Sequence, residues 1–287
     1  MRGLIINADD LGTDEARNAG IFEAIREGMV TSVSLLANGP AVEDAIRGIA
    51  TLREKKISIG IHLNLSEGVP LASGLRRLTG RDGYFLGKAG AHDLLSGPRE
   101  SDLEREIQRE FEVQAQVLKK AGIPISHLDG HQHVHVFPAA VGAAVNLARR
   151  YRIPWMRAPE EPVPNPDDAA VGVHLLQEAR NFSGLGKEAR LLLIEEGIRT
   201  TDHFRGLYLK DRLSLSSLIE SLKALPEGLT ELMVHPGRIS PTSPSNPFSR
   251  FSTVYREKEL EALLDRGFRK GLGENGVELV PFPELDR

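Results

Sequence analysis

The chain has 287 residues, of which 40% are hydrophobic and 26% charged, and this is long enough to bury a full hydrophobic core. Chains of this size commonly form one α/β barrel, so we expect a single domain over residues 1–287. The formal net charge of -4 gives no reason to expect a nucleic-acid partner. Cysteine does not occur in the sequence, which excludes disulfides, thiolate nucleophiles and cysteine-ligated zinc sites.

The start of the chain and its hydropathy indicate a location. Met1 to Asn7 leads directly into a strand-like run and lacks the charged region, apolar stretch and small-residue cleavage site of a secretory signal. We therefore expect a cytoplasmic protein. No stretch approaches the ~18 consecutive apolar residues of a membrane span, so we expect no membrane partner.

Short apolar runs alternate along the chain with longer segments of helical periodicity. This alternation predicts a parallel sheet, and the runs themselves are typical of buried strands. The predicted strands are Leu4–Ile6, Val33–Leu36, Ile57–Ile61, Ile153–Met156, Leu232–Val234 and Val277–Val280. The predicted helices are Asp14–Glu27, Val42–Lys55, Asp102–Ala121, Pro138–Tyr151, Lys187–Gly197, Leu215–Leu225 and Glu257–Gly271.

Candidate catalytic side chains follow the apolar runs almost immediately. In a barrel of parallel strands, the carboxyl ends of the strands share one rim, and active sites form at that rim. Groups that are distant in the sequence are therefore expected to become neighbours there. The residues in question are Asp9, Asp10, His62, His127, Arg157 and His235.

The first motif, N-A-D-D-L-G at Asn7–Gly12, places two adjacent carboxylates at the end of a buried strand. Unpaired buried charge is unfavourable, so we expect these carboxylates to serve chemistry: one can bind a metal while the other accepts a proton. The alternative is an ordinary Asx turn in which Gly12 supplies a positive φ.

His62 lies in I-G-I-H-L-N-L-S-E-G, at the end of a strongly apolar strand. A lone histidine at such a position is more often a hydrogen-bonded core residue than a functional one. The polar residues Asn64 and Glu67 continue beyond it, and the Ser66–Gly68 loop is placed to reach a substrate.

The segment H-L-D-G-H-Q-H-V-H, from His127 to His135, contains four of the nine histidines of the chain. Imidazole and carboxylate ligands together suit divalent first-row metals, so this tract predicts a metal site. A fully extended segment would span roughly 26 Å at ~3.3 Å per residue, too far for one ion to bind every histidine. Either two neighbouring histidines share an ion or Gly130 turns the chain, and the other histidines then line a substrate cleft.

Two further side chains follow predicted strands. Arg157, in W-M-R-A-P-E, is placed either to pair with a surface acid or to hold a catalytic carboxylate in its ionised form. His235, in M-V-H-P-G, is followed by Pro236 and Gly237, which force a turn and would fix the imidazole at the rim. We expect His235 to be a general acid or base.

Several function classes remain open at this point. A metal-dependent phosphoester hydrolase could use the same ligands, although it would usually need more cationic residues than Arg157 alone. Two histidines and one carboxylate also fit a non-haem iron oxygenase. A sugar- or metal-binding protein is the non-enzymatic alternative. No phosphate-binding loop and no G-x-S-x-G serine motif occurs in the sequence.

Four motifs, in this order and at this spacing, resemble the YdjC-like family, whose members include chitooligosaccharide (diacetylchitobiose) deacetylases. They are N-A-D-D-L-G at Asn7–Gly12, I-G-I-H-L at Ile59–Leu63, the tract His127–His135, and M-V-H-P-G at Met233–Gly237. The resemblance spans nearly the whole chain. It implies a single-domain, distorted TIM-like (β/α) barrel related to polysaccharide deacetylases, and removal of an acetyl group from an N-acetylated sugar.

The resemblance also implies roles for individual residues. The metal ligands would be Asp10, His62 and His127. Asp9 would be the general base, and, by looser analogy with polysaccharide deacetylases, His235 would be the general acid and Arg157 would orient Asp9. Those enzymes use two histidines at an i, i+4 spacing, which His127 and His131 share, so His131 is a rival to His62 as a ligand.

The implied cofactor is one divalent metal ion, with magnesium or zinc favoured and manganese, cobalt or nickel also compatible with nitrogen and oxygen ligands. A small carbohydrate substrate and a homodimer are the expected partners. Two positions depart from the family pattern: Leu11 stands where phenylalanine is common, and Gln132 where histidine is frequent. Neither departure removes a proposed ligand.

Overall fold

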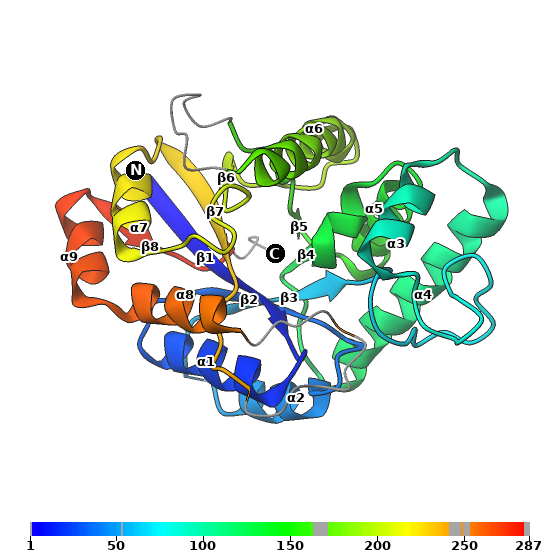
Figure 1. Cartoon of the computed structure of the whole chain (residues 1–287), viewed down its shortest axis with the longest axis horizontal. Coiled ribbons are helices and arrows are strands. Elements are labelled where there is room, and N and C mark those ends of the chain that lie inside the picture. The colour runs from blue at the N-terminus through cyan, green and yellow to red at the C-terminus, as the bar shows by residue number, and fades with distance from the viewer. Residues whose placement is uncertain (1, 53, 163–171, 241–247, 249–252, 284–287) are drawn as a thin grey trace.

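The computed structural model describes residues 2–52, 54–162, 172–240, 248 and 253–283. A curled sheet is surrounded by helices in this part of the chain (Figure 1). The strands are β1 (Arg2–Leu11), β2 (Ser32–Leu35), β3 (Ser58–Leu63), β4 (His127–Gly130), β5 (Trp155–Met156), β6 (His203–Arg205), β7 (Gly228–Val234) and β8 (Val277–Leu279). The helices are α1 (Glu15–Arg26), α2 (Val42–Ala50), α3 (Gly87–Ser96), α4 (Ser101–Lys120), the 3₁₀ helix η1 (His131–Val136), α5 (Val141–Tyr151), α6 (Val173–Glu195), α7 (Leu215–Lys223), α8 (Val254–Leu264) and α9 (Arg266–Glu274).

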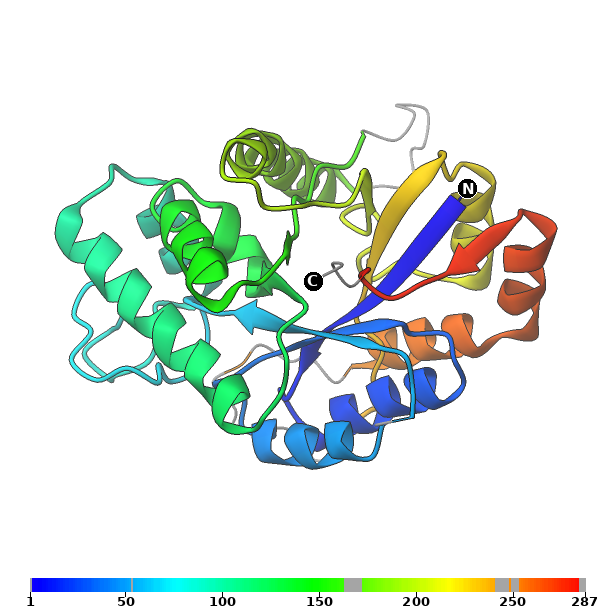
Figure 2. The ribbon, with the colours of Figure 1, turned by 180° about the vertical axis from the view of Figure 1, so that it is seen from behind.

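All the strand pairs are parallel, in the order β5-β4-β3-β2-β1-β7-β6, and β8 pairs with the first residues of β1. The reverse view shows β8 beside the start of β1 (Figure 2). Within the described residues, β5 and β6 do not pair with each other, so the sheet forms an open, distorted barrel. The predicted α/β fold with a curled parallel sheet is confirmed.

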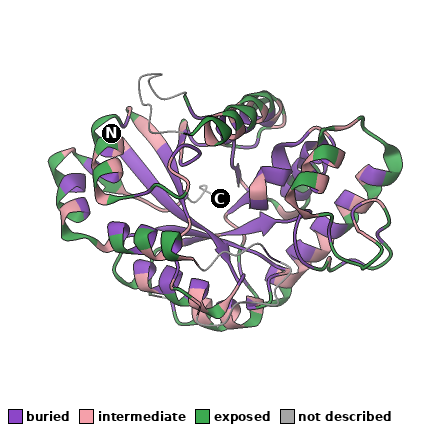
Figure 3. Ribbon diagram, in the orientation of Figure 1, coloured by how far each residue is buried: buried purple, intermediate pink, exposed green. Residues whose placement is uncertain are grey.

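Most strand residues are buried, although β6 and β8 each have only one buried residue, and the helices expose their outer faces to solvent (Figure 3). Helix α4 is an example of a helix with one apolar face. Its residues Leu103, Ile107 and Phe111 recur at helical spacing and are buried on the face that contacts β3 and α5. Within the described part of the chain, no helix is long and apolar enough to cross a membrane.

The predicted elements needed five corrections. Helices α3 and the first half of α6 were not predicted, and the predicted helix Glu257–Gly271 is two helices separated by Asp265. Strand β6 was missed because it has only three residues, two of them polar. His127 was expected to follow the apolar run Ile123–Ile125, but it is itself the first residue of a strand, β4.

Candidate metal and catalytic site

A bulge at the end of β1 turns both adjacent aspartates toward the rim. Ala8 pairs with Val33 and Leu11 with Leu35, so three residues of β1 advance against two of β2. Asp10 adopts a left-handed backbone with φ of 66°, which is rare and costly for a residue with a side chain. Successive side chains of a regular strand point to opposite faces, and the bulge removes this restriction. Asp9 and Asp10 therefore line the same cavity.

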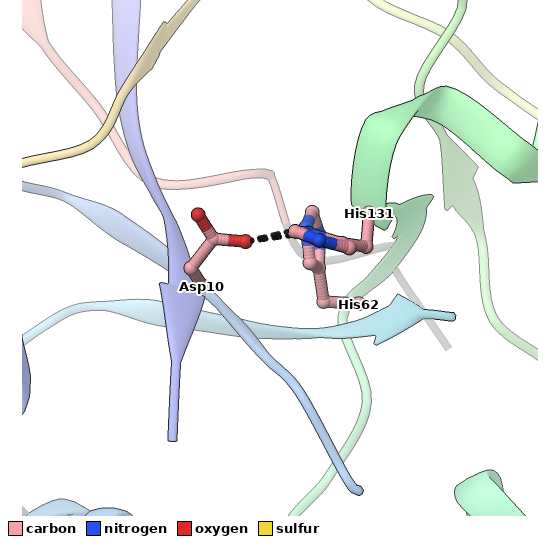
Figure 4. Close-up of side chains that lie close together, drawn as sticks. All are labelled: Asp10, His62 and His131. Carbon is pink, nitrogen blue, oxygen red and sulfur yellow. Dashed lines mark hydrogen bonds and ion pairs between the residues drawn. The ribbon is translucent and has the colours of Figure 1, made fainter. Parts of the chain in front are cut away.

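Asp10, His62 and His131 form a compact buried group (Figure 4). His131 Nδ1 lies 2.8 Å from Asp10 Oδ1, and His62 Nε2 lies 3.3 Å from the same oxygen. One ligand atom of each residue lies within 4.8 Å of those of the other two. Two imidazoles and one carboxylate within this reach are a suitable donor set for a divalent first-row metal.

His62 is fixed by a second carboxylate behind it. Its Nδ1 donates a hydrogen bond of 2.7 Å to Asp129 Oδ1, which leaves Nε2 directed toward Asp10. Metal-binding histidines usually donate their other ring nitrogen to a carboxylate or carbonyl in this way, which sets both tautomer and ring orientation. The surroundings of His62 thus fit a ligand.

The electrostatics of this group favour a cation. Burial alone would lower the pKa of His62, but the charge of Asp129 and the bonds to Asp10 and Asp129 raise it to about 10. Burial would raise the pKa of Asp10, yet the neighbouring His131 and His62 bring it well below its ordinary value. Buried carboxylates here stabilise positive charge on the imidazoles, and a metal ion would replace those protons.

Asp9 is held by Arg157, which follows β5. Arg157 donates from both terminal nitrogens to the two oxygens of Asp9 at 2.7 Å each, and Asn7 donates a further bond of 2.7 Å to Asp9 Oδ1. The same guanidinium contacts Asp129 and Glu231. Burial opposes its charge, but these three carboxylates raise the pKa of Arg157 well above its ordinary value. Arg157 is therefore a permanent cation that fixes the position of Asp9.

His235 follows β7 and lines the cavity, as predicted from the turn at Pro236 and Gly237. Its backbone N–H donates a 2.6 Å hydrogen bond to Glu259 of α8. Burial and the nearby charge of Arg256 lower the pKa of His235 well below its ordinary value. The imidazole is therefore neutral at the cavity wall.

The structure leaves His127 away from the Asp10, His62 and His131 group. Its Nε2 lies 3.1 Å from Asn7 Oδ1, its Nδ1 lies 2.8 Å from Ser126 Oγ, and its ring stacks on Phe282. Burial lowers its pKa to about 3. The cause is the position of β4: His127 is the first residue of this strand, which stays extended through Gly130, whereas η1 begins with His131 at the carboxyl end of the strand, where β1 and β3 also end.

The remaining histidines of the tract lie in η1, where Gln132 and His133 have a left-handed backbone. His133 lines the cavity, as expected for a substrate cleft, whereas His135 is buried with its Nε2 3.1 Å from the carbonyl oxygen of Arg157. A side chain at Gly130 would lie 2.7 Å from His135 Nδ1, so only glycine fits.

The cavity has a volume of about 370 Å³, within the usual range for small-molecule sites. Besides His133, five residues predicted as catalytic groups or metal ligands line it, namely Asp9, Asp10, His62, His131 and His235. Arg157 is not among the residues that line the cavity, but it contacts Asp9, which does. The sequence did not predict Asp129 as a partner of His62 and Arg157, or Glu231 as a partner of Arg157. Asp129 lies within the histidine tract, and Glu231 is the only charged residue of β7, so an acidic residue at a buried strand position was the available signal.

The fold and this geometry define an α/β-barrel protein with a buried group of two histidines and one aspartate that could bind a metal. The family profile described as YdjC-like protein matches residues 3–274, and the chain belongs to that family. The resemblance inferred from the four motifs is thus confirmed.

Similar proteins agree with this assignment. A carbohydrate deacetylase of Mus musculus is 33% identical, covering 99% of this chain and 94% of that protein. A carbohydrate deacetylase of Brevibacillus brevis is 30% identical, and the match covers 98% of this chain and 99% of that protein. A crystal structure from Enterococcus faecalis V583, provisionally described as a cellobiose-phosphate cleavage protein, has a TM-score of 0.73 at 24% identity and covers 98% of this chain and 97% of that one. It supports the fold.

Proposed function

We propose that this protein is a metal-dependent deacetylase that removes the acetyl group from N-acetylated sugars, such as mono- or oligosaccharides containing N-acetylglucosamine. The products are acetate and an amino sugar. The observation that carries the proposal is the grouping of Asp10, His62 and His131 beside Asp9 in one cavity. The relatives named carbohydrate deacetylase supply the substrate class.

The proposed ligands of the metal ion are Asp10, His62 and His131, with magnesium or zinc favoured. We assign His131 rather than His127 to this set. The 2.8 Å contact of His131 Nδ1 with Asp10 Oδ1 supports this choice, whereas His127 Nε2 contacts Asn7. When bound, a divalent ion in such a site acts as a Lewis acid and makes water a stronger nucleophile. The remaining steps depend on side chains of the chain itself.

Amide hydrolysis needs a base for the attacking water and an acid for the departing amine. Asp9 lines the cavity next to Asp10 and is held by Arg157, so we assign it the role of general base. His235 is assigned the delivery of a proton to the amine. Because its imidazole is neutral, His235 must first take up a proton from solvent, which it then donates to the departing amine. Asp9 takes one proton from the attacking water and later releases it to solvent, so the two exchanges with solvent cancel.

A phosphoester substrate is less well supported. The cavity wall does contain three further cations, Lys88, Lys210 and Arg256. Each is paired with an acid, however: both lysines contact Glu178, and Arg256 contacts Glu259 and Asp211. The positive charge available to a phosphate is therefore small.

The test is acetate release from a panel of N-acetylated mono- and disaccharides, using protein stripped with a chelator and then reconstituted with Mg²⁺, Zn²⁺, Mn²⁺, Co²⁺ or Ni²⁺. We expect acetate only after reconstitution. Sugar binding without acetate release would favour a binding protein, and oxygen consumption restricted to the iron form would favour an oxygenase. Acetate release that continues at full rate in the stripped protein would overturn the metal-dependent mechanism.

A further inference from the structure

Glu67 contacts the metal-site histidine His131 and its neighbour Gln132 at the same time. His131 Nε2 lies 3.1 Å from Glu67 Oε2, and Gln132 Nε2 donates a 3.0 Å hydrogen bond to Glu67 Oε1. Glu67 is 7% exposed and His131 2% exposed. Each carboxylate oxygen thus contacts a different residue of η1.

The Glu67 backbone is itself firmly held. Asn64 Oδ1 accepts from the Glu67 N–H at 3.2 Å, and Asn64 Nδ2 donates to the Glu67 carbonyl at 2.7 Å. Asn64 is in turn anchored to helix α4, because its backbone N–H and carbonyl form bonds of 3.0 and 2.7 Å with the side-chain amide of Gln114. Glu67 is therefore connected through buried hydrogen bonds to a rigid element.

The two metal-site histidines face Asp10 through different nitrogens. His62 uses Nε2, because Asp129 accepts from its Nδ1, whereas His131 uses Nδ1, because Glu67 is placed to accept from its Nε2. A carboxylate that accepts from one ring nitrogen leaves the other free for a metal. Glu67 stands in the same relation to His131 as Asp129 does to His62.

Gln132 has an unusual backbone that this contact helps to explain. Gln132 and His133 are both left-handed, with φ of 51° and 59°. Such residues persist where surrounding contacts hold them in place, and they concentrate at functional sites. Gln132 is also one of the two positions named above as departing from the family pattern, and its amide donates to Glu67.

We propose that Glu67, held by Gln132, is a positioning residue that fixes His131 as an Nδ1 metal ligand. This inference rests on the proposed metal site. It assigns to Glu67 no contact with the reacting atoms. Its effect passes through the tautomer and ring orientation of His131.

The test measures Zn²⁺ affinity of the full chain by competition with a chelator, in the wild type and in Glu67→Ala, Glu67→Gln and Gln132→Ala. Removing such a carboxylate typically weakens metal affinity about 10- to 100-fold, and we expect this for Glu67→Ala. Glu67→Gln should recover part of the loss because its amide oxygen can still accept from Nε2. Gln132→Ala should lose less, and adding it to Glu67→Ala should cause no further loss.

Glu161→Gln is the matched control. Glu161 is also a buried glutamate, but it accepts from the backbone N–H groups of Gly206 and Leu207. We expect its Zn²⁺ affinity to equal that of the wild type. Thermal unfolding of each variant separates a weakened site from a protein that has failed to fold.

Long-range ¹H–¹⁵N spectra of the Zn²⁺-loaded protein provide the second measurement. The wild type should show His131 with a proton on Nε2 and His62 with a proton on Nδ1. Unchanged affinity in folded Glu67→Ala, or a wild-type His131 protonated on Nδ1, would refute the positioning role while leaving the metal site intact. A wild type that binds no metal would instead overturn the proposed function and this inference with it.

Discussion

Arg157 binds Asp9 in a two-point interaction, with one terminal nitrogen on each carboxylate oxygen at 2.7 Å, and both side chains are almost fully buried. They lie 148 positions apart in the sequence, at the ends of β5 and β1. The pair couples stability to function, because the cation that fixes the proposed base also neutralises Asp129 and Glu231.

Replacing Arg157 with Met should destabilise the fold strongly. Three buried carboxylates would lose their shared cation, and removing one partner of a buried pair typically costs about 3–5 kcal/mol. Urea unfolding monitored by circular dichroism measures the change. Arg77→Met is the control, since the Arg77 and Glu100 pair is exposed, and its unfolding midpoint should stay near that of the wild type. An Arg157→Met protein as stable as the wild type would contradict the structural role of the pair.

Asp9→Asn should retain the metal and lose most turnover. Asparagine keeps the shape of Asp9 but cannot accept a proton, and general acid–base groups typically contribute 10²–10⁴-fold in rate. Metal content by elemental analysis and acetate release measure the two properties separately. Activity that survives nearly intact would remove Asp9 as the base.

Most of the side chains at the carboxyl rim of the sheet could be predicted, because one physical rule determines which residues lie there. Parallel strands bring their carboxyl ends together, and polar residues directly after apolar runs are placed there whatever their separation in the chain. This rule correctly placed Asp9, Asp10, His62 and His235 around one cavity. It could not reveal the bulge in β1, because the left-handed backbone of Asp10 carries no sequence signal comparable to glycine.

The histidine tract could not be resolved from the sequence, because its spacing permits several geometries. Whether His127 or His131 faces Asp10 depends on where β4 begins and ends, and a shift of that strand exchanges their positions. The short strand provides only one apolar residue, Leu128, to mark its register. The contacts of Glu67 and Glu231 with distant residues likewise depend on tertiary structure alone.

His131→Ala and His127→Ala should separate the two candidate ligands. His131 lies 2.8 Å from Asp10, so its removal should abolish stoichiometric metal binding, whereas His127→Ala should still bind one equivalent. Isothermal titration with Zn²⁺ measures both. Loss of binding in a folded His127→Ala protein, together with retention in His131→Ala, would restore His127 to the ligand set.

Glu161 should make the stability of the protein fall as the pH rises from about 4.5 to about 7. Burial raises the pKa of Glu161 to about 7, even though backbone N–H groups of Leu207 and Gly206 partly oppose this shift. Between its unfolded and folded pKa values the native state binds more protons than the unfolded state, so its stability decreases with pH, by at most about 1.4 kcal/mol per unit. Glu161→Gln cannot titrate, so its unfolding free energy should fall less steeply over this range. Urea unfolding at intervals from pH 4.5 to 8 compares the two proteins, and parallel curves would show that Glu161 is ionised in the folded protein at neutral pH.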